Sequence, residues 1–169
     1  MSLSMHQASV PVFVMSLKAM SGILDKAEAH CVAKKIDPAI MLGLRLSPDM
    51  FAFTRQLQIA TDFAKGAAAR LAGVEPPAFE DNEKSFADLK ARIQKTIDYM
   101  TSLKPAQIDG SEARDVTIKI AGNPVTFKGQ HYLMHFAIPN FYFHLTTAYA
   151  LLRANGVDVG KGDFLAGSR

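Results

Sequence analysis

Polar side chains interrupt the apolar seams of two predicted helices, and a helical bundle builds ligand sites at such positions. In the last helix Asn140 and His144 are four residues apart, so they share one helical face. In an earlier helix Gln58 and Asp62 have the same spacing, and Arg55 lies one turn before them. Amide and imidazole groups can fix a small molecule by hydrogen bonds. The candidate ligand-binding residues are Gln58, Asn140, His144, Arg55, Asp62 and Tyr142.

A second histidine pair offers a different chemistry, because His131 and His135 are four residues apart and could chelate one ion from a single helical face. Residues 132–134 between them contain no glutamate, so the metalloprotease motif is absent. Histidines at this spacing are more often surface or capping residues. His6, at the end of the first apolar stripe, could approach either histidine group.

The composition is that of an ordinary globular protein. The 169 residues are 49% hydrophobic and 21% charged, which predicts one domain spanning residues 1–169. The single Cys31 excludes an intramolecular disulfide and a multi-cysteine zinc site, and its apolar seam predicts an inert, buried thiol. The beginning of the chain has no basic segment, and the apolar run 10–14 is too short to span a bilayer. We therefore expect a cytoplasmic protein without a membrane partner.

The net charge of +3 does not indicate a nucleic-acid partner. Lysines and arginines are scattered among sixteen acidic residues, without a basic run. The chain also lacks tryptophan and an aromatic-rich RNA-binding segment. The charges predict a solvated surface.

The apolar spacing predicts four long helices. The first carries its apolar stripe over residues 10–31; Ser4 can cap it, and Pro11 either kinks it or moves its start to about residue 10. The second covers 48–72, because Ser47-Pro48-Asp49 is a typical helix start and Gly73 a typical end. The third begins at Ser85 and ends before residue 105, with Lys90, Arg92, Lys95 and Asp98 directed to solvent. The last covers about 130–155, with Pro139 either kinking it or beginning its second half.

Between the third and fourth helices the apolar period changes from helical to alternating. Residues 116–120 and 125–128 alternate, and a turn at 121–124 separates them, which predicts a β-hairpin whose apolar face packs on the bundle. After the last helix, Val159 and Phe164 could dock on the hairpin or the bundle. The fold class is therefore all-α: a four-helix bundle, up-and-down or crossover, with a short β-hairpin between its third and fourth helices.

The sequence resembles an uncharacterised bacterial family of the DinB-like superfamily over nearly its whole length. The resemblance rests on the opening residues 1–6, on Ser47-Pro-Asp-Met-Phe51, on the helix end at 71–73, and on the segment Pro139-Asn-Phe-Tyr-Phe-His144 with its continuation to Gly156. It implies a DinB-like four-helix bundle, often dimeric. Many DinB-like proteins hold a divalent metal with one histidine from the second helix and two, four apart, from the last. Some use the metal in thiol-dependent transferase or isomerase reactions.

That pattern falls on Gln58, Asn140 and His144 in this chain. Two of the three implied imidazoles are therefore amides, which are poor ligands for zinc or nickel. We expect a degenerate metal site without a favoured cofactor, retained as a small-molecule pocket or as a structural polar cluster. No catalytic residue is predicted.

Two alternatives remain open. One is a thiol transferase or isomerase that binds zinc or nickel through His144 and a set drawn from His6, His131, His135 and Asp62, which must converge on one point. The other is a homodimeric interaction protein in which the alanine-rich second helix packs closely against a partner.

Overall fold

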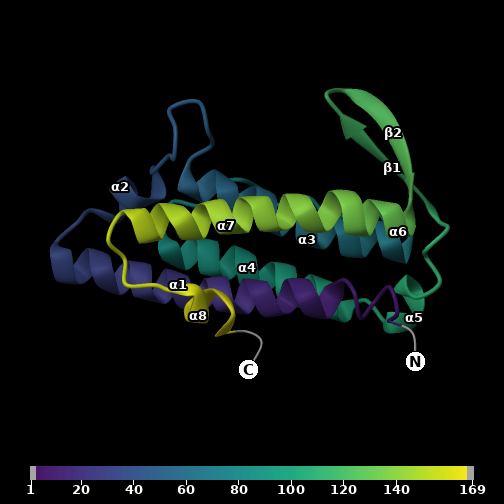
Figure 1. Ribbon diagram of the computed structural model, residues 1–169, viewed down its shortest axis with the longest axis horizontal. Coiled ribbons are helices and arrows are strands. Elements are labelled where there is room, and N and C mark those ends of the chain that lie inside the picture. The colour runs from purple at the N-terminus through teal and green to yellow at the C-terminus, as the bar shows by residue number, and fades with distance from the viewer. Residues whose placement is uncertain (1–2, 167–169) are drawn as a thin grey trace.

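A computed structural model describes residues 3–166, and Figure 1 shows a bundle of long helices with a hairpin at one end. The long helices are α1 (Val10–Lys34), α3 (Phe53–Ala72), α4 (Phe86–Ser102) and a last helix composed of α6 (Gly129–Tyr132), η1 (Leu133–Ala137) and α7 (Ile138–Ala154). Helix α3 packs on both α7 and α4, and α1 packs on α4. The predicted fold class, a bundle with a hairpin before its last long helix, is confirmed.

Three short helices fill connections in which no helix was predicted. They are α2 (Pro38–Leu42), α5 (Pro105–Ile108) and α8 (Lys161–Phe164). The carboxylate of Asp37 caps α2 by accepting a hydrogen bond from the Ala39 amide at 2.9 Å. Each of these helices is at most five residues long, so it gives little periodic signal in the sequence.

The predicted start of the second long helix is wrong. Residues 47–50 form an isolated turn, in which the Met50 amide donates to the Ser47 carbonyl at 3.0 Å and the Ser47 hydroxyl donates to the Asp49 carboxylate. Ala52 is extended, and α3 begins only at Phe53, whose amide donates to the Leu44 carbonyl at 2.8 Å. Ser47, Pro48 and Asp49 thus form a turn and not a helix start, because the polar groups of the turn bond to one another.

The last helix contains a wide turn directly before Pro139. Five residues, Leu133–Ala137, form the π-helical segment η1, and Pro139 then lies in the first turn of α7. Pro139 therefore begins the second half of the last helix, which is one of its two predicted roles. The side-chain amide of Asn140 donates to the Phe136 carbonyl at 2.7 Å, so it is bound within its own helix.

Strands β1 (Asp115–Ile120) and β2 (Asn123–Lys128) pair antiparallel, with Val116 opposite Phe127. The turn between them has positive φ at both Ala121 and Gly122. Val116 is buried at the base, but Ile120 near the tip is 38% exposed. Ile118 and Phe127 also pack against the core, as predicted, whereas the tip of the hairpin projects from the bundle (Figure 1).

The alanine-rich face of α3 lies inside the bundle. Ala60, Ala64, Ala67 and Ala68 are fully buried, and they bring α3 close to its neighbours α4 and α7. The surface that was expected to contact a homodimer partner is therefore used within one chain. Cys31 is buried as predicted, and burial, reinforced by the nearby Glu28 and Asp37, raises the pKa of its thiol.

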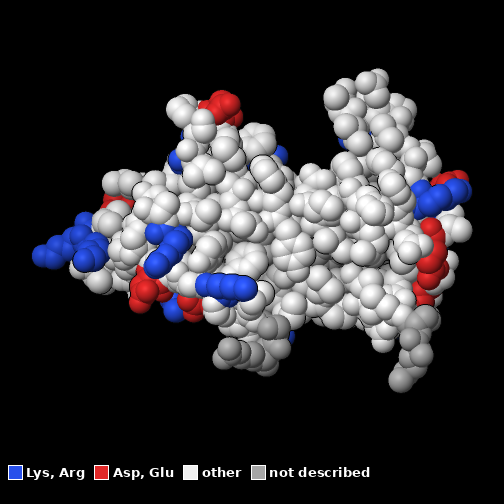
Figure 2. All heavy atoms as spheres, viewed as in Figure 1, with Lys and Arg blue, Asp and Glu red and all other residues white. Residues whose placement is uncertain are grey.

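The segment after α7 docks on the bundle and not on the hairpin. Val159 is buried, and the ring of Phe164 contacts Tyr149 edge-on at 5.5 Å, while α8 lies against α1. Figure 2 shows that charged side chains gather toward the ends and edges of the visible face and are sparse across its middle. Within residues 3–166, no helix combines the length and the apolarity that crossing a membrane requires.

Candidate functional site

His144 lies on α7 and is bonded to a glutamine of α3. Its Nδ1 atom is 2.7 Å from Oε1 of Gln56. The Gln56 amide nitrogen donates to the Phe51 carbonyl at 3.0 Å, which orients the amide so that its oxygen faces the imidazole. Nδ1 must therefore carry the proton, and Nε2 is an acceptor that makes no hydrogen bond to any residue in 3–166.

The surroundings of His144 keep the imidazole neutral. The residue is 9% exposed, and Phe63 stacks on its ring at 6.0 Å while Phe143 meets the ring edge-on at 5.1 Å. Burial lowers the pKa of His144, and the positive charge of Arg55 lowers it further. The site therefore offers an unprotonated nitrogen beside aromatic walls at neutral pH.

Gln58 is bonded away from His144, toward the loop that precedes α4. Its amide nitrogen donates to the Glu83 carboxylate at 2.7 Å, and its oxygen accepts from Arg55 at 3.2 Å. Arg55 also pairs with Asp81 of the same loop. With Asn140 bonded to its own helix, both amides that were expected to assist His144 have other partners.

Tyr142 does not lie with the polar residues around His144. Its hydroxyl lies 3.1 Å from the Ser16 hydroxyl of α1, which connects α7 with the first helix. Sequence reasoning instead missed Gln56 and Phe63. A signal for Gln56 was present, because it lies three residues after Phe53 and four before Ala60, on the apolar face itself.

Arg92 is buried, contrary to the prediction that it faces solvent. Residues 73–85 cross over α3 and α4 and cover the side of α4 that the helical pattern alone assigns to water. The arginine side chain is 3% exposed. Its guanidinium donates to Thr61, Glu80, Glu83 and Asp62 at 2.7–2.9 Å and lies 3.1 Å from Asp81.

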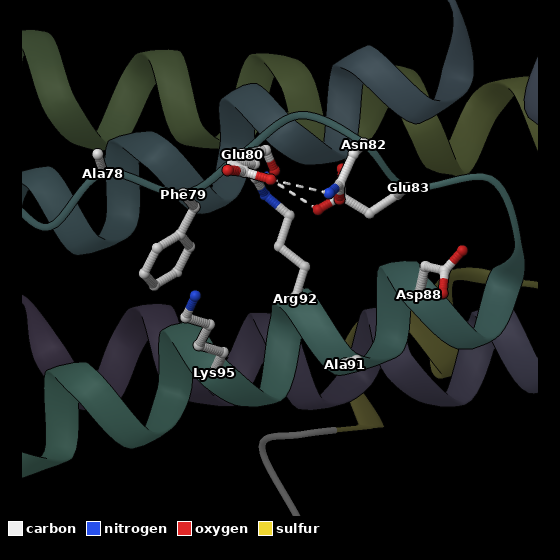
Figure 3. Close-up of a pocket in the computed structure, with 9 residues that line it drawn as sticks. All are labelled: Ala78, Phe79, Glu80, Asn82, Glu83, Asp88, Ala91, Arg92 and Lys95. Carbon is white, nitrogen blue, oxygen red and sulfur yellow. Dashed lines mark hydrogen bonds and ion pairs between the residues drawn. The ribbon is translucent and has the colours of Figure 1, made fainter.

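Figure 3 shows how Arg92 reaches from α4 to the loop, next to a hollow of about 650 Å³. Lys95 lies over the Phe79 ring at 4.2 Å, a cation–π contact that holds the loop from the same helix. Asp62, which was a candidate ligand residue, bonds to Arg92 and also pairs with Lys65 at 3.0 Å. The positive and negative groups around Arg92 thus satisfy one another, as expected of an anchor for the loop.

The residues present do not fit a zinc or nickel site of the DinB-like type. Among residues 3–166, no three histidine, cysteine, aspartate or glutamate side chains converge to hold a metal. The rings of His131 and His135 are 4.7 Å apart, but along the helix His135 is roughly 13 Å from His144. His6 lies near α5, where its backbone amide donates to Asp109 at 2.8 Å. The set proposed for a metal enzyme therefore does not assemble around His144.

Comparison with known proteins places the chain in a family. A family model described as a domain of unknown function, DUF1993, matches residues 5–165. A crystal structure of a DinB family member protein from Shewanella denitrificans is 39% identical, with a TM-score of 0.86 over 95% of this chain and 90% of that one. A search of curated proteins gives no match.

Proposed function

The chain belongs to the DUF1993 family and is similar to a DinB family protein, and from this premise we propose that it binds a small neutral molecule at His144 without a transition metal. The ligand would carry a hydroxyl or amide N–H group that donates to Nε2 of the imidazole. The observation that supports this proposal most directly is the Gln56 amide, which fixes the proton on Nδ1 and leaves Nε2 free to accept.

The aromatic residues around the imidazole suit a ligand with a flat apolar part. Phe63 covers one face of His144 and also lies 5.8 Å from Phe136, so the walls continue from α3 to η1. Because Gln58 and Asn140 are bonded elsewhere, His144 would be the only member of the three ligand positions that meets the molecule. Its role is that of a hydrogen-bond acceptor and not of a base, since burial opposes the charged form.

The first test is the protonation state of the imidazole. Long-range ¹H–¹⁵N correlation spectra of labelled protein at pH 7.5 should show His144 as the Nδ1–H tautomer. Phenol should shift the His144 resonances, whereas anisole, in which a methyl group replaces the hydroxyl hydrogen, should shift them much less. An Nε2–H tautomer, or equal responses to phenol and anisole, would contradict the proposal.

The second test concerns metal. Untagged protein, purified without chelator and then exposed to zinc, nickel and manganese, is analysed for metal content by mass spectrometry. We expect no stoichiometric retention, because a single imidazole with two amides is a weak donor set. One metal ion per chain that disappears in His144→Ala would overturn the proposal and support a metal-dependent transferase.

A further inference from the structure

A second hollow, of about 530 Å³, lies between the hairpin and the bundle. Its volume is within the range of small-molecule pockets, roughly 300–1,000 Å³. Phe63 and Phe136 contribute aromatic surface, and Ile118 of β1 and Pro76 add apolar area. The hairpin, which projects from the bundle, thus forms one side of a mostly preformed site.

Arg70 brings into this hollow a positive charge that has no ion-pair partner among residues 3–166. Its Nη1 atom donates to the Tyr132 hydroxyl at 3.2 Å, and Tyr132 itself is 1% exposed. No aspartate or glutamate in residues 3–166 forms an ion pair with Arg70, whereas Arg92 and Arg55 both have carboxylate partners. A half-buried guanidinium without a counter-ion gains most from an anion that reaches it.

A glycine makes room for this guanidinium. A Cβ atom at position 66 would lie 2.5 Å from Nη1 of Arg70, so a side chain there would force the guanidinium to shift from its observed position. The Arg70 side chain is therefore held between Gly66 and Tyr132. Because it is already ordered, a ligand would lose less conformational entropy in binding to it.

We propose that this hollow binds a small organic monocarboxylate with a flat apolar body. The carboxylate would accept hydrogen bonds from the guanidinium of Arg70, and the ring would lie against Phe63 and Phe136. Lys119 adds a positive charge to the lining, while the exposed Glu75 disfavours a second carboxylate. The site shares the Phe63 and Phe136 walls with the function proposed above, but it depends on Arg70 and not on Nε2 of His144, so changes at Arg70 test it separately.

The test uses 1-naphthoate and its uncharged isostere 1-naphthamide, titrated calorimetrically into the full chain. We expect the carboxylate to bind at least about tenfold more tightly, which is what hydrogen bonds to a charged group contribute. Arg70→Met removes the charge, and Gly66→Ala displaces the guanidinium while retaining it in the sequence. Both variants should lose the preference. Gly22→Ala is the matched control, because a Cβ there meets nothing within 4 Å.

Thermal unfolding followed by circular dichroism establishes that each variant is folded at the titration temperature. The proposal is overturned if naphthoate does not bind at millimolar concentration, or if naphthamide binds equally well. It is also overturned if folded Arg70→Met keeps the preference for the carboxylate. Loss of the preference in both α3 variants, with Gly22→Ala unchanged, supports the assigned site.

Discussion

Nδ1 of His144 and Oε1 of Gln56 lie 2.7 Å apart and connect α7 with α3. The bond decides which imidazole nitrogen is protonated, because the Phe51 carbonyl fixes the glutamine amide from its other side. A glutamine two residues before the expected position therefore determines the chemistry that remains available to His144.

The stability of the protein should depend on pH through His144. The pKa of this histidine is lowered in the folded state by burial and by Arg55, so protons bind preferentially to the unfolded chain. The stabilisation from the neutral imidazole is complete above the pKa of histidine in the unfolded chain, about 6.5. It is lost as the pH falls from there toward the lower pKa of His144 in the folded protein. Urea unfolding between pH 8 and pH 5 should show this decrease, and His144→Gln should show less of it. An unchanged slope in the variant would refute the assignment.

Arg92 and Glu83 should behave as a coupled buried pair. Their charged atoms are 2.9 Å apart, and both side chains are less than a tenth exposed. Arg92→Met leaves the buried Glu83 carboxylate without its cation and should lower the free energy of unfolding by about 3–5 kcal/mol. The double variant Arg92→Met/Glu83→Gln should also have a lower free energy of unfolding. Its decrease should be smaller, by at least about 1 kcal/mol, than the sum of the decreases in the two single variants.

Denaturant titration of the two single variants and the double variant measures this coupling. The exposed pair of Lys128 and Asp115 serves as a control, since both side chains are 64% exposed. Lys128→Met should change stability by no more than about 0.5 kcal/mol. Strict additivity of the Arg92 and Glu83 changes would mean that the loop is held by other contacts.

Gly129 should not tolerate a side chain. A Cβ atom there would overlap the Ser111 carbonyl oxygen, and the Gly129 amide itself donates to the Arg114 carbonyl at 2.8 Å. Because backbone cannot move aside as a flexible side chain can, Gly129→Ala should cost at least about 2 kcal/mol. Gly22→Ala, within α1, should be neutral or stabilising. Equal melting temperatures for the two variants would disprove this account.

The long elements could be predicted because their apolar spacing is sustained over many residues. The third helix, for example, begins where Ser85 predicts, and the Ser85 hydroxyl accepts from the Asp88 amide at 3.0 Å. The start of α3 could not be predicted, because the Ser47 signal serves equally well in a turn. Local sequence does not show whether Ser47 begins a helix or a turn. The start of α3 is instead fixed by the hydrogen bond from the Phe53 amide to the Leu44 carbonyl.

The candidate site was only partly predictable. His144 and Gln58 are buried polar residues of facing helices, as their spacing predicted, but their hydrogen-bond partners are not the residues that were expected. Periodicity places Arg92 toward water, since it cannot show that residues 73–85 fold over α4. The carboxylates that enclose this arginine come from α3 and from the loop before α4, so only the folded chain brings them together.

The bond from Gln58 to Glu83 opposes a histidine at position 58. A histidine that turned toward His144 would leave one oxygen of the buried Glu83 carboxylate without its hydrogen bond. A histidine that kept this bond would point away from His144. Either result defeats a three-histidine site. Histidines at positions 58 and 140 alone would therefore not create a metal site, and residues 73–85 would have to change with them. Position 58 and the loop are constrained to evolve together.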